Sequence, residues 1–199
     1  MTNALIYLVD DDDAVRDALG SLLSSVGYRV STHADAEAFL RAVCPVEHAC
    51  IIIDIRLVGT SGLKLAERIR QLGLELPFIF LSGHADVPAT VRAFKLGAID
   101  LLQKPVAEHV LLDAIANALA HDLRTKVQAA EAAQLAARQH RLSPREREVL
   151  KGIAQGKTSR TMAEDWGVSV RTVEAQRATL FEKLEVQHVL DLAPYLPRT

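Results

Sequence analysis

Several features that define other classes of protein are scarce or missing in this chain of 199 residues. No apolar run approaches the roughly 20 residues that a membrane-spanning helix needs. The chain begins Met-Thr-Asn-Ala, followed by a short apolar run and four aspartates, which fits neither a signal peptide nor a transit peptide. Only two cysteines occur, so a disulfide framework is excluded and a reducing compartment fits. We therefore expect a cytoplasmic protein without a membrane segment.

The two cysteines, Cys44 and Cys50, could bind a metal ion together with His48. These three side chains lie within seven residues of one another, and no second cluster elsewhere in the chain completes a tetrahedral site. We therefore interpret them as two free thiols and an ordinary histidine.

An excess of positive charge is also missing, because the formal net charge is −2. Residues 1–120 hold 10 Lys+Arg against 15 Asp+Glu, residues 121–141 hold 4 against 2, and residues 142–199 hold 9 against 8. Acidic residues are thus concentrated in the first part of the chain. A C-terminal segment only one unit positive gives little support for nucleic-acid binding, so that function would have to be argued from a motif.

The first 120 residues alternate short apolar runs with longer stretches of helical spacing. Continuous runs such as Ile51-Ile52-Ile53 are typical of strands covered on both faces, as in a parallel sheet between helices. The pattern predicts an α/β fold with a five-stranded, doubly wound parallel sheet. The predicted strands are Ala4–Val9, Tyr28–His33, Ala49–Ile53, Pro77–Leu81 and Ala98–Leu102.

After Pro105 the pattern stays helical to about His140. The first half of this stretch is the expected fifth helix of the α/β unit. The second half, from Lys126, is rich in Ala, Gln and Glu and poor in large apolar residues, which is typical of an exposed helical linker with weak capacity to pair. We therefore predict domains at 1–120 and 142–199, joined by a linker at 121–141.

The last segment opens with Ser143-Pro144-Arg145-Glu146, a capping box with proline at the first helical position. The helix that starts there should end near Gly156. A second helix is predicted from about Thr158 to Trp166, a third from Ser169 to about Leu184, and a fourth from Gln187 to Tyr195. This all-α segment is expected to form a helix-turn-helix domain.

Polar residues follow four of the predicted strands at the point where each strand ends. Asp10 to Asp13 follow the first strand, Asp54 the third, Ser82 the fourth and Lys104 the fifth. The carboxyl ends of parallel strands meet at one edge of the sheet, where such folds bind ligands. Clustered carboxylates favour a hard divalent cation such as Mg²⁺. With a lysine and a hydroxyl nearby, the edge has the parts needed to form an aspartyl phosphate.

Four blocks of sequence carry a resemblance to the receiver domain of response regulators, and to FixJ-like members in particular. They are LVDDDDAVR, IIIDIRLVGTSG, FIFLSGHAD and GAIDLLQKP, within residues 1 to about 120. The resemblance implies a flavodoxin-like fold, an Mg²⁺ cofactor, and a sensor histidine kinase as partner. It implies the following roles: phosphoacceptor Asp54; metal ligands Asp10, Asp11, Asp54 and the Arg56 carbonyl; phosphoryl-binding residues Ser82 and Lys104.

Two positions depart from the receiver pattern. Val58 stands where a proline is usual, and Leu101 stands where an aromatic switch residue is expected. Neither position belongs to the phosphorylation chemistry, but Leu101 implies a weaker conformational switch. Asp12 and Asp13 match no functional position of the family and are expected to begin the first helix, where negative charge is favourable.

Residues 142–199 resemble the LuxR-type helix-turn-helix domain through the blocks LSPREREVLKGIAQG and TSRTMAEDWGVSVRTVEAQRATLFEKL. An apolar stripe of Val170, Val173, Leu180 and Leu184 should pack the third helix on the other two. The opposite face, which also carries Glu182, should enter the major groove of double-stranded DNA, with Thr172 and Thr179 flanking it. The residues predicted to contact DNA are Lys157, Ser159, Arg160, Arg171, Thr172, Glu174, Ala175 and Ala178.

Other residues of this segment are interpreted structurally. Arg177 lies toward the apolar stripe, so a pair with Glu146 or Glu148 is at least as plausible as a DNA contact. The family usually has Asn-Lys where this chain has Ser159-Arg160, and often histidine at Gln176. The final HVLDLAPYLPRT resembles the family's last helix, a site of dimer contacts, only poorly.

Together these patterns predict a two-component response regulator that is phosphorylated on Asp54, forms a homodimer when phosphorylated and controls transcription. The chain is expected to be no enzyme beyond assisting its own phosphorylation and dephosphorylation. One alternative is a phosphorylation-independent regulator that uses the receiver for dimerisation, as Val58 and Leu101 would allow. The other is an Mg²⁺-dependent phosphatase of the dehalogenase-like kind, but such enzymes need a second aspartate where this chain has Arg56.

Overall fold

The computed structural model describes residues 4–44, 48–83 and 86–196. It divides into two compact units, Met1–Lys126 and Val127–Thr199. The predicted linker bounds of 121 and 141 are not tested by this division and stay a prediction. Within the described ranges, no helix is both long and apolar enough to span a membrane.

The first unit is built on a five-stranded parallel sheet, as the sequence predicts. Its strand order is β2-β1-β3-β6-β7, so the chain reverses direction across the sheet between β1 and β3. Ligands bind at such a reversal, outside the carboxyl ends of the strands. The strands are β1 Leu5–Val9, β2 Arg29–His33, β3 Ala49–Asp54, β6 Phe78–Ser82 and β7 Asp100–Gln103.

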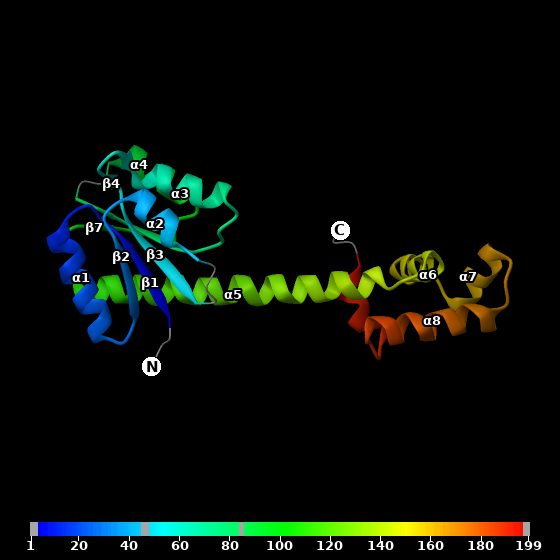
Figure 1. The fold of residues 1–199 in the computed structure, drawn as a ribbon. Coiled ribbons are helices and arrows are strands. Elements are labelled where there is room, and N and C mark those ends of the chain that lie inside the picture. The colour runs from blue at the N-terminus through cyan, green and yellow to red at the C-terminus, as the bar shows by residue number, and fades with distance from the viewer. Residues whose placement is uncertain (1–3, 45–47, 84–85, 197–199) are drawn as a thin grey trace. The chain divides into compact units, whose positions relative to one another are not determined.

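Helices cover both faces of this sheet (Figure 1). Successive residues of a strand point to opposite faces, so Ile51 and Ile53 join one core while Cys50 and Ile52 join the other. The first core is covered by α2, α3 and α4, and the second by α1 and the first half of α5. The helices are α1 Asp13–Ser25, α2 Ala36–Ala42, α3 Gly62–Gln71, α4 Val87–Lys95 and α5 Glu108–His140.

The start of α1 confirms the structural role predicted for two of the clustered aspartates. Asp12 is the N-cap, and its side chain accepts hydrogen bonds from the backbone N–H groups of Ala14 and Val15. Asp13 is the first helical residue, where its negative charge interacts favourably with the helix dipole. Their contribution is therefore to fix where the helix begins.

A small antiparallel hairpin, which the sequence analysis did not predict, follows β3. It consists of β4 Arg56–Leu57 and β5 Thr60–Ser61, and its turn contains Gly59 with a φ of 80°. Strands this short lack the alternating pattern by which a strand is recognised. The hairpin leads directly from Asp54 to the start of α3.

The second unit contains the predicted helices and the end of α5. The capping box is confirmed, because Ser143 accepts from the Glu146 N–H at 3.2 Å while Glu146 Oε2 accepts from the Ser143 N–H at 2.7 Å. The core gathers Val149, Leu180 and Leu184. The helices are α6 Pro144–Ala154, α7 Ser159–Trp166 and α8 Val170–Leu184.

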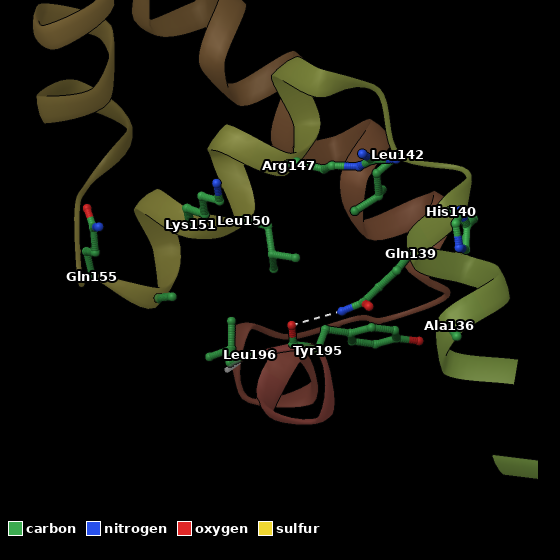
Figure 2. Close-up of a pocket in the computed structure, with 11 residues that line it drawn as sticks. Ala136, Gln139, His140, Leu142, Arg147, Leu150, Lys151, Gln155, Tyr195 and Leu196 are labelled. Carbon is green, nitrogen blue, oxygen red and sulfur yellow. Dashed lines mark hydrogen bonds between the residues drawn. The ribbon is translucent and has the colours of Figure 1, made fainter. Parts of the chain in front are cut away.

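The prediction of a fourth helix from Gln187 is corrected to a shorter 3₁₀ helix, η1 Val189–Tyr195. Pro194 lies inside it and supplies no N–H for a longer helix. Tyr195 holds this element in place. Its hydroxyl donates a hydrogen bond to the Leu184 carbonyl at 3.0 Å. Its carbonyl accepts one from Gln139 Nε2 at 3.0 Å (Figure 2). The C-terminal segment is therefore tied to α8 and to the end of α5.

Candidate functional site

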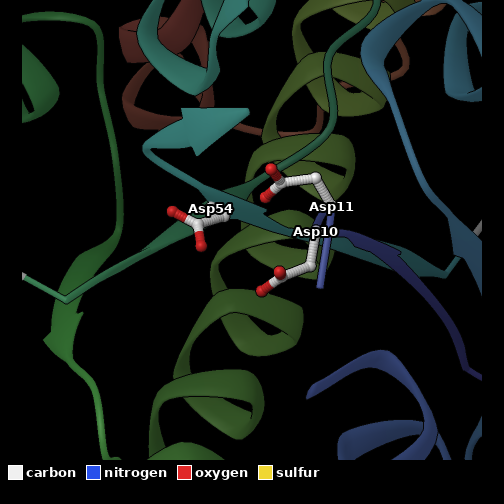
Figure 3. Close-up of side chains that lie close together, drawn as sticks. All are labelled: Asp10, Asp11 and Asp54. Atoms are coloured by element: carbon white, nitrogen blue, oxygen red, sulfur yellow. The ribbon is translucent and has the colours of Figure 1, made fainter. Parts of the chain in front are cut away.

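Three aspartates meet at the carboxyl ends of β1 and β3, on either side of the strand reversal (Figure 3). Asp10 and Asp54 are buried, whereas Asp11 is exposed. One carboxylate oxygen from each lies within 4.8 Å of those of the other two. The sequence predicted this convergence from the strand ends, and the structure places the three side chains together.

Lys104 enters the same pocket from the residue after β7. Its Nζ lies 2.6 Å from Asp10 Oδ2, and it also forms an ion pair with Asp54 Oδ2. Burial lowers the pKa of Lys104, but the hydrogen bonds and charges of the two carboxylates outweigh that effect and raise it. The lysine is therefore held as a cation between two buried carboxylates.

Asp10 is fixed by further contacts. Its Oδ1 accepts a hydrogen bond from the Asp12 N–H at 3.0 Å, and its carbonyl accepts from Arg16 Nη1 at 2.6 Å. Burial raises the pKa of the Asp10 carboxyl above its ordinary value, against the opposing influence of Lys104. A divalent cation at this site would favour the charged form.

The loop after β3 orients Asp54. Asp54 Oδ1 accepts a hydrogen bond from the Arg56 N–H at 2.7 Å. The backbone of Gly62 approaches closely from α3, because a Cβ at this position would lie 2.1 Å from the Asp54 carbonyl oxygen. Glycine is thus required where the hairpin returns to the phosphoacceptor candidate.

Arg16 and Gly62 were not singled out from the sequence. Both act on the pocket through the backbone of an aspartate, Arg16 at Asp10 and Gly62 at Asp54. The sequence signals that could have indicated these two roles are weak. Arg16 lies in the first turn after the capping Asp12, and Gly62 directly follows Ser61, the cap of α3.

The remaining residues of the predicted pocket lie at the same end of the sheet. Ser82 is buried at the end of β6, and its carbonyl accepts from the Lys104 N–H at 2.8 Å. Leu101 is half-buried in β7, opposite Phe80 of β6. Val58 is exposed in the hairpin turn. Neither of these two departures from the receiver pattern changes the acidic cluster.

The donor set fits a hard divalent cation. Asp10, Asp11 and Asp54 offer only oxygen atoms, and Mg²⁺ is usually held by a few carboxylates together with water. By contrast, burial raises the pKa of the Cys50 thiol to about 12, which keeps it protonated, and Cys44 is exposed. Among the described residues, the acidic cluster is the group of side chains suited to a metal ion.

The second candidate site is the outer face of α8 with the start of α7. Thr158 and Ser169 cap the two helices, and Gly167 makes the turn between them in the left-handed conformation with a φ of 65°. Of the eight residues predicted to contact DNA, Ser159 is half-buried and the others are exposed: Lys157, Arg160, Arg171, Thr172, Glu174, Ala175 and Ala178.

A hollow of about 480 Å³ lies where the N-termini of α6 and α8 meet. Arg145 and Arg171 line it together with Thr172, Ala175 and Gln176. The Glu146 carboxylate also lines this hollow, so charges of both signs are present in it. Within the described chain, Gln176 Oε1 is a buried atom without a hydrogen-bond partner.

Two predictions about α8 are wrong. Val170 is exposed in the first turn, so the buried stripe consists of Val173, Leu180 and Leu184. Arg177 is not paired with Glu146 or Glu148. Its Nη1 instead donates a hydrogen bond to Ser159 Oγ at 3.4 Å.

The two glutamates have other partners. Glu146 is held by Lys183 at 2.8 Å, and Glu148 by Arg145 at 2.6 Å.

Comparison with known proteins matches each of the two units to a family. Residues 6–116 match the model of the response regulator receiver domain, and residues 140–196 match that of the bacterial regulatory proteins of the luxR family. The response regulator protein TmoT of Ectopseudomonas mendocina is 41% identical over 95% of this chain and 86% of its own length. The transcriptional regulatory protein FixJ of Bradyrhizobium diazoefficiens is 37% identical over 96% of this chain and 93% of its own.

Solved structures give the same result. The response regulator StyR superposes with a TM-score of 0.85 at 34% identity, over 97% of this chain and 98% of that one. Full-length FixJ from B. japonicum superposes with a TM-score of 0.62 at 36% identity, over 98% and 96% of the two chains.

A parallel sheet that ends in this acidic pocket, followed by a helix-turn-helix, defines a regulatory protein with a receiver and a DNA-binding output domain. The chain belongs to the FixJ-like response regulators with a luxR-family output domain, and it is a two-component transcriptional response regulator.

Proposed function

We propose that Asp54 accepts a phosphoryl group from a sensor histidine kinase, with Mg²⁺ as cofactor. In this reaction an Asp54 carboxylate oxygen attacks the phosphorus of the kinase phosphohistidine, the P–N bond breaks, and the imidazole takes up a proton. Phosphorylation then controls sequence-specific binding to double-stranded DNA. Because that target is the chromosome, we propose that the protein acts in the cytoplasm.

The observation that carries this proposal is the placement of Lys104 on both buried carboxylates. An ammonium group beside Asp54 can move to the oxygens of a transferred phosphoryl group and neutralise their charge. The hydroxyl of Ser82, which is buried at the end of the neighbouring strand, would donate a hydrogen bond to the same phosphoryl group. Arg56 would hold the loop through its N–H bond to Asp54.

Four groups would hold the metal: the carboxylates of Asp10, Asp11 and Asp54 and the carbonyl of Arg56. When bound, Mg²⁺ supplies charge neutralisation for the phosphoryl oxygens. The chain lacks a general acid two residues after Asp54, where Arg56 is exposed. We therefore propose that the receiver assists only its own phosphorylation and dephosphorylation, and the phosphatase alternative has no support at this position.

For the output unit we propose that α8 enters the major groove. Arg171 would bind guanine or phosphate, Glu174 would accept from cytosine, and Ala175 and Ala178 would contact thymine methyl groups. The phosphate contacts would come from Lys157, Ser159, Arg160 and Thr172. Lys157 and Arg160 form exposed ion pairs with Asp165 and Glu164, respectively. Exposed ion pairs contribute little to stability, so both cations can exchange these partners for a DNA phosphate.

We further propose that phosphorylation promotes a homodimer through α4 and β7 of the receiver. The outer side of α4 exposes three large apolar residues, Val87, Val91 and Phe94. Exposed apolar side chains gathered on one element are typical of an interaction surface. A two-fold dimer would match a DNA site with two-fold symmetry.

Incubation with acetyl phosphate and Mg²⁺, followed by intact-protein mass spectrometry and measurement of the oligomeric state, tests the proposal. The wild-type chain should gain one phosphoryl group and shift toward dimer, whereas Asp54→Asn should do neither. Chelation of Mg²⁺ with EDTA should prevent labelling of the wild type.

Labelling of Asp54→Asn to the wild-type extent would exclude Asp54 as the acceptor. A labelled wild type with an unchanged dimer fraction would instead favour the phosphorylation-independent regulator.

A further inference from the structure

A cavity of about 580 Å³ lies within the second unit, bounded by the end of α5, by α6 and by the residues at the end of η1 (Figure 2). Small-molecule sites in proteins commonly have volumes of about 300–1,000 Å³. None of the residues that line this cavity belongs to α8. It is therefore separate from the face proposed to read DNA.

The walls of the cavity are mainly apolar. Leu142 precedes α6 and Leu150 lies within it, and both are otherwise buried in the core. Tyr195 and Leu196 form the opposite wall, as Figure 2 shows. Apolar side chains gathered around a space of this size favour a ligand with an apolar or aromatic body.

Two cations at the cavity give it a second chemical property. Arg147 and Lys151 both line it, one helical turn apart on α6, and both are exposed. No aspartate or glutamate is among the described residues that line it. Within the described ranges neither cation has an ion pair, whereas Arg145, Lys157, Arg160 and Lys183 of the same unit all do.

The wall formed by η1 is held in place without a ligand. The Tyr195 hydroxyl donates to the Leu184 carbonyl and accepts from Arg138 Nη1 at 3.3 Å, and Gln139 holds the Tyr195 carbonyl. A site ordered beforehand loses less conformational entropy when it binds.

We propose that this cavity binds a small organic anion: a carboxylic acid with an aromatic or branched apolar body. The apolar body lies between Leu150 and the wall of Tyr195 and Leu196. The carboxylate lies at the rim, where Arg147 and Lys151 neutralise its charge. An uncharged molecule of the same shape keeps the apolar contacts but loses the charge interaction.

The probe pair phenylbutyrate and phenylbutanol tests this proposal, since the two differ in the charged group and share the apolar body. Each is titrated into the full-length chain, and binding is followed by backbone amide chemical shifts. Phenylbutyrate should shift the amides of Gln139, Leu150 and Lys151 and should bind about tenfold more tightly than phenylbutanol.

Two variants sharpen the test. The double variant Arg147→Ala with Lys151→Ala should weaken phenylbutyrate about tenfold and leave phenylbutanol unchanged. Its matched control, Arg41→Ala with Lys95→Ala, removes the same charge from exposed sites of the first unit and should change neither. Ala154→Trp places a large side chain in the cavity and should abolish the binding of both probes.

The proposal is overturned if phenylbutyrate causes no shifts at millimolar concentration in the wild type. It is equally overturned if Ala154→Trp binds phenylbutyrate as the wild type does, or if the two double variants weaken it to the same extent.

Discussion

Among single residues, Lys104 and the two aspartates it contacts define the chemistry of the pocket. Asp10, Asp54, Ser82 and Lys104 could be predicted from the sequence, because each follows a strand and parallel strands bring their ends together. Arg16 could not be predicted in the same way. Its contact is with a backbone carbonyl, which depends on how α1 packs beside β1 and carries no pattern in the sequence.

Gly62 provides the prediction at this scale. In Gly62→Ala the new Cβ meets the Asp54 carbonyl oxygen at 2.1 Å and Ile53 Cγ2 at 2.7 Å, and backbone cannot move away as a flexible side chain can. We expect a loss of about 2–4 kcal/mol in the free energy of unfolding of the receiver, measured by denaturation followed by circular dichroism. Phosphorylation by acetyl phosphate should also slow, because the loop carrying Asp54 is displaced.

Gly20→Ala is the matched control. Gly20 lies within α1, and its added Cβ would meet only Thr32 Cγ2 at an ordinary 3.5 Å. Alanine is favoured in a helix, so stability should stay the same or rise by up to about 1 kcal/mol. Equal stability losses in the two variants would show that the close approach at Asp54 has no special role.

Individual helices and strands were predicted well where the pattern was long. The five strands of the parallel sheet differ from their predicted bounds by only one or two residues. The hairpin β4–β5 was not predicted, because its strands are too short to show an alternating pattern. The 3₁₀ helix η1 was predicted as an α-helix, because the spacing of its apolar residues does not distinguish the two kinds of helix. On α8, the helical wheel placed Val170 on the apolar face. It did not show that Val170 is exposed, because this residue lies at the end of the helix.

The start of α6 should make the stability of the second unit depend on pH. Burial raises the pKa of Glu146, but Lys183 and the N–H and hydroxyl of Ser143 outweigh that effect and lower it below its ordinary value. A lowered carboxyl pKa stabilises the folded state above the unfolded pKa, and this stability is lost as the pH falls through the folded pKa. The contribution should therefore be complete at neutral pH and should disappear in acid.

Glu146→Gln tests this effect. At about pH 7 it should lower the free energy of unfolding by about 1–2 kcal/mol, and its difference from the wild type should shrink below about pH 4.5. Fluorescence of Trp166, the one tryptophan of the chain, reports unfolding of this unit. Glu164→Gln, which breaks an exposed pair, should cost little at either pH. A difference that stays constant with pH would contradict the assigned role.

Helix α8 gives a prediction about DNA. Arg171→Ala should weaken binding by about 1–3 kcal/mol, and if Arg171 contacts phosphate the salt dependence should fall by about one unit of slope. Titrations at several salt concentrations measure both quantities. Arg147→Ala is the control, since it removes the same charge from the same unit away from α8. Equal losses in both variants would indicate attraction by net charge rather than a contact on α8.

For the whole molecule, the separation into an acidic receiver and an α-helical output unit could be predicted from composition and periodicity, and both family matches agree with it. The bounds of the linker stay a prediction, because α5 runs without a break from Glu108 to His140. Along this helix the sequence signal is a change in composition, because large apolar residues become scarce from Lys126 onward. The cavity at the end of η1 was also not predictable, since it depends on three separate segments meeting.

The central claim is that phosphorylation of Asp54 controls binding to DNA. It is tested most directly by the affinity of the full-length chain for the tightest site enriched from a random-sequence DNA library, with and without acetyl phosphate and Mg²⁺. The wild type should bind at least about tenfold more tightly when phosphorylated, equivalent to about 1.4 kcal/mol, and Asp54→Asn should show no change. Equal affinities of the phosphorylated and unphosphorylated wild type would contradict the claim.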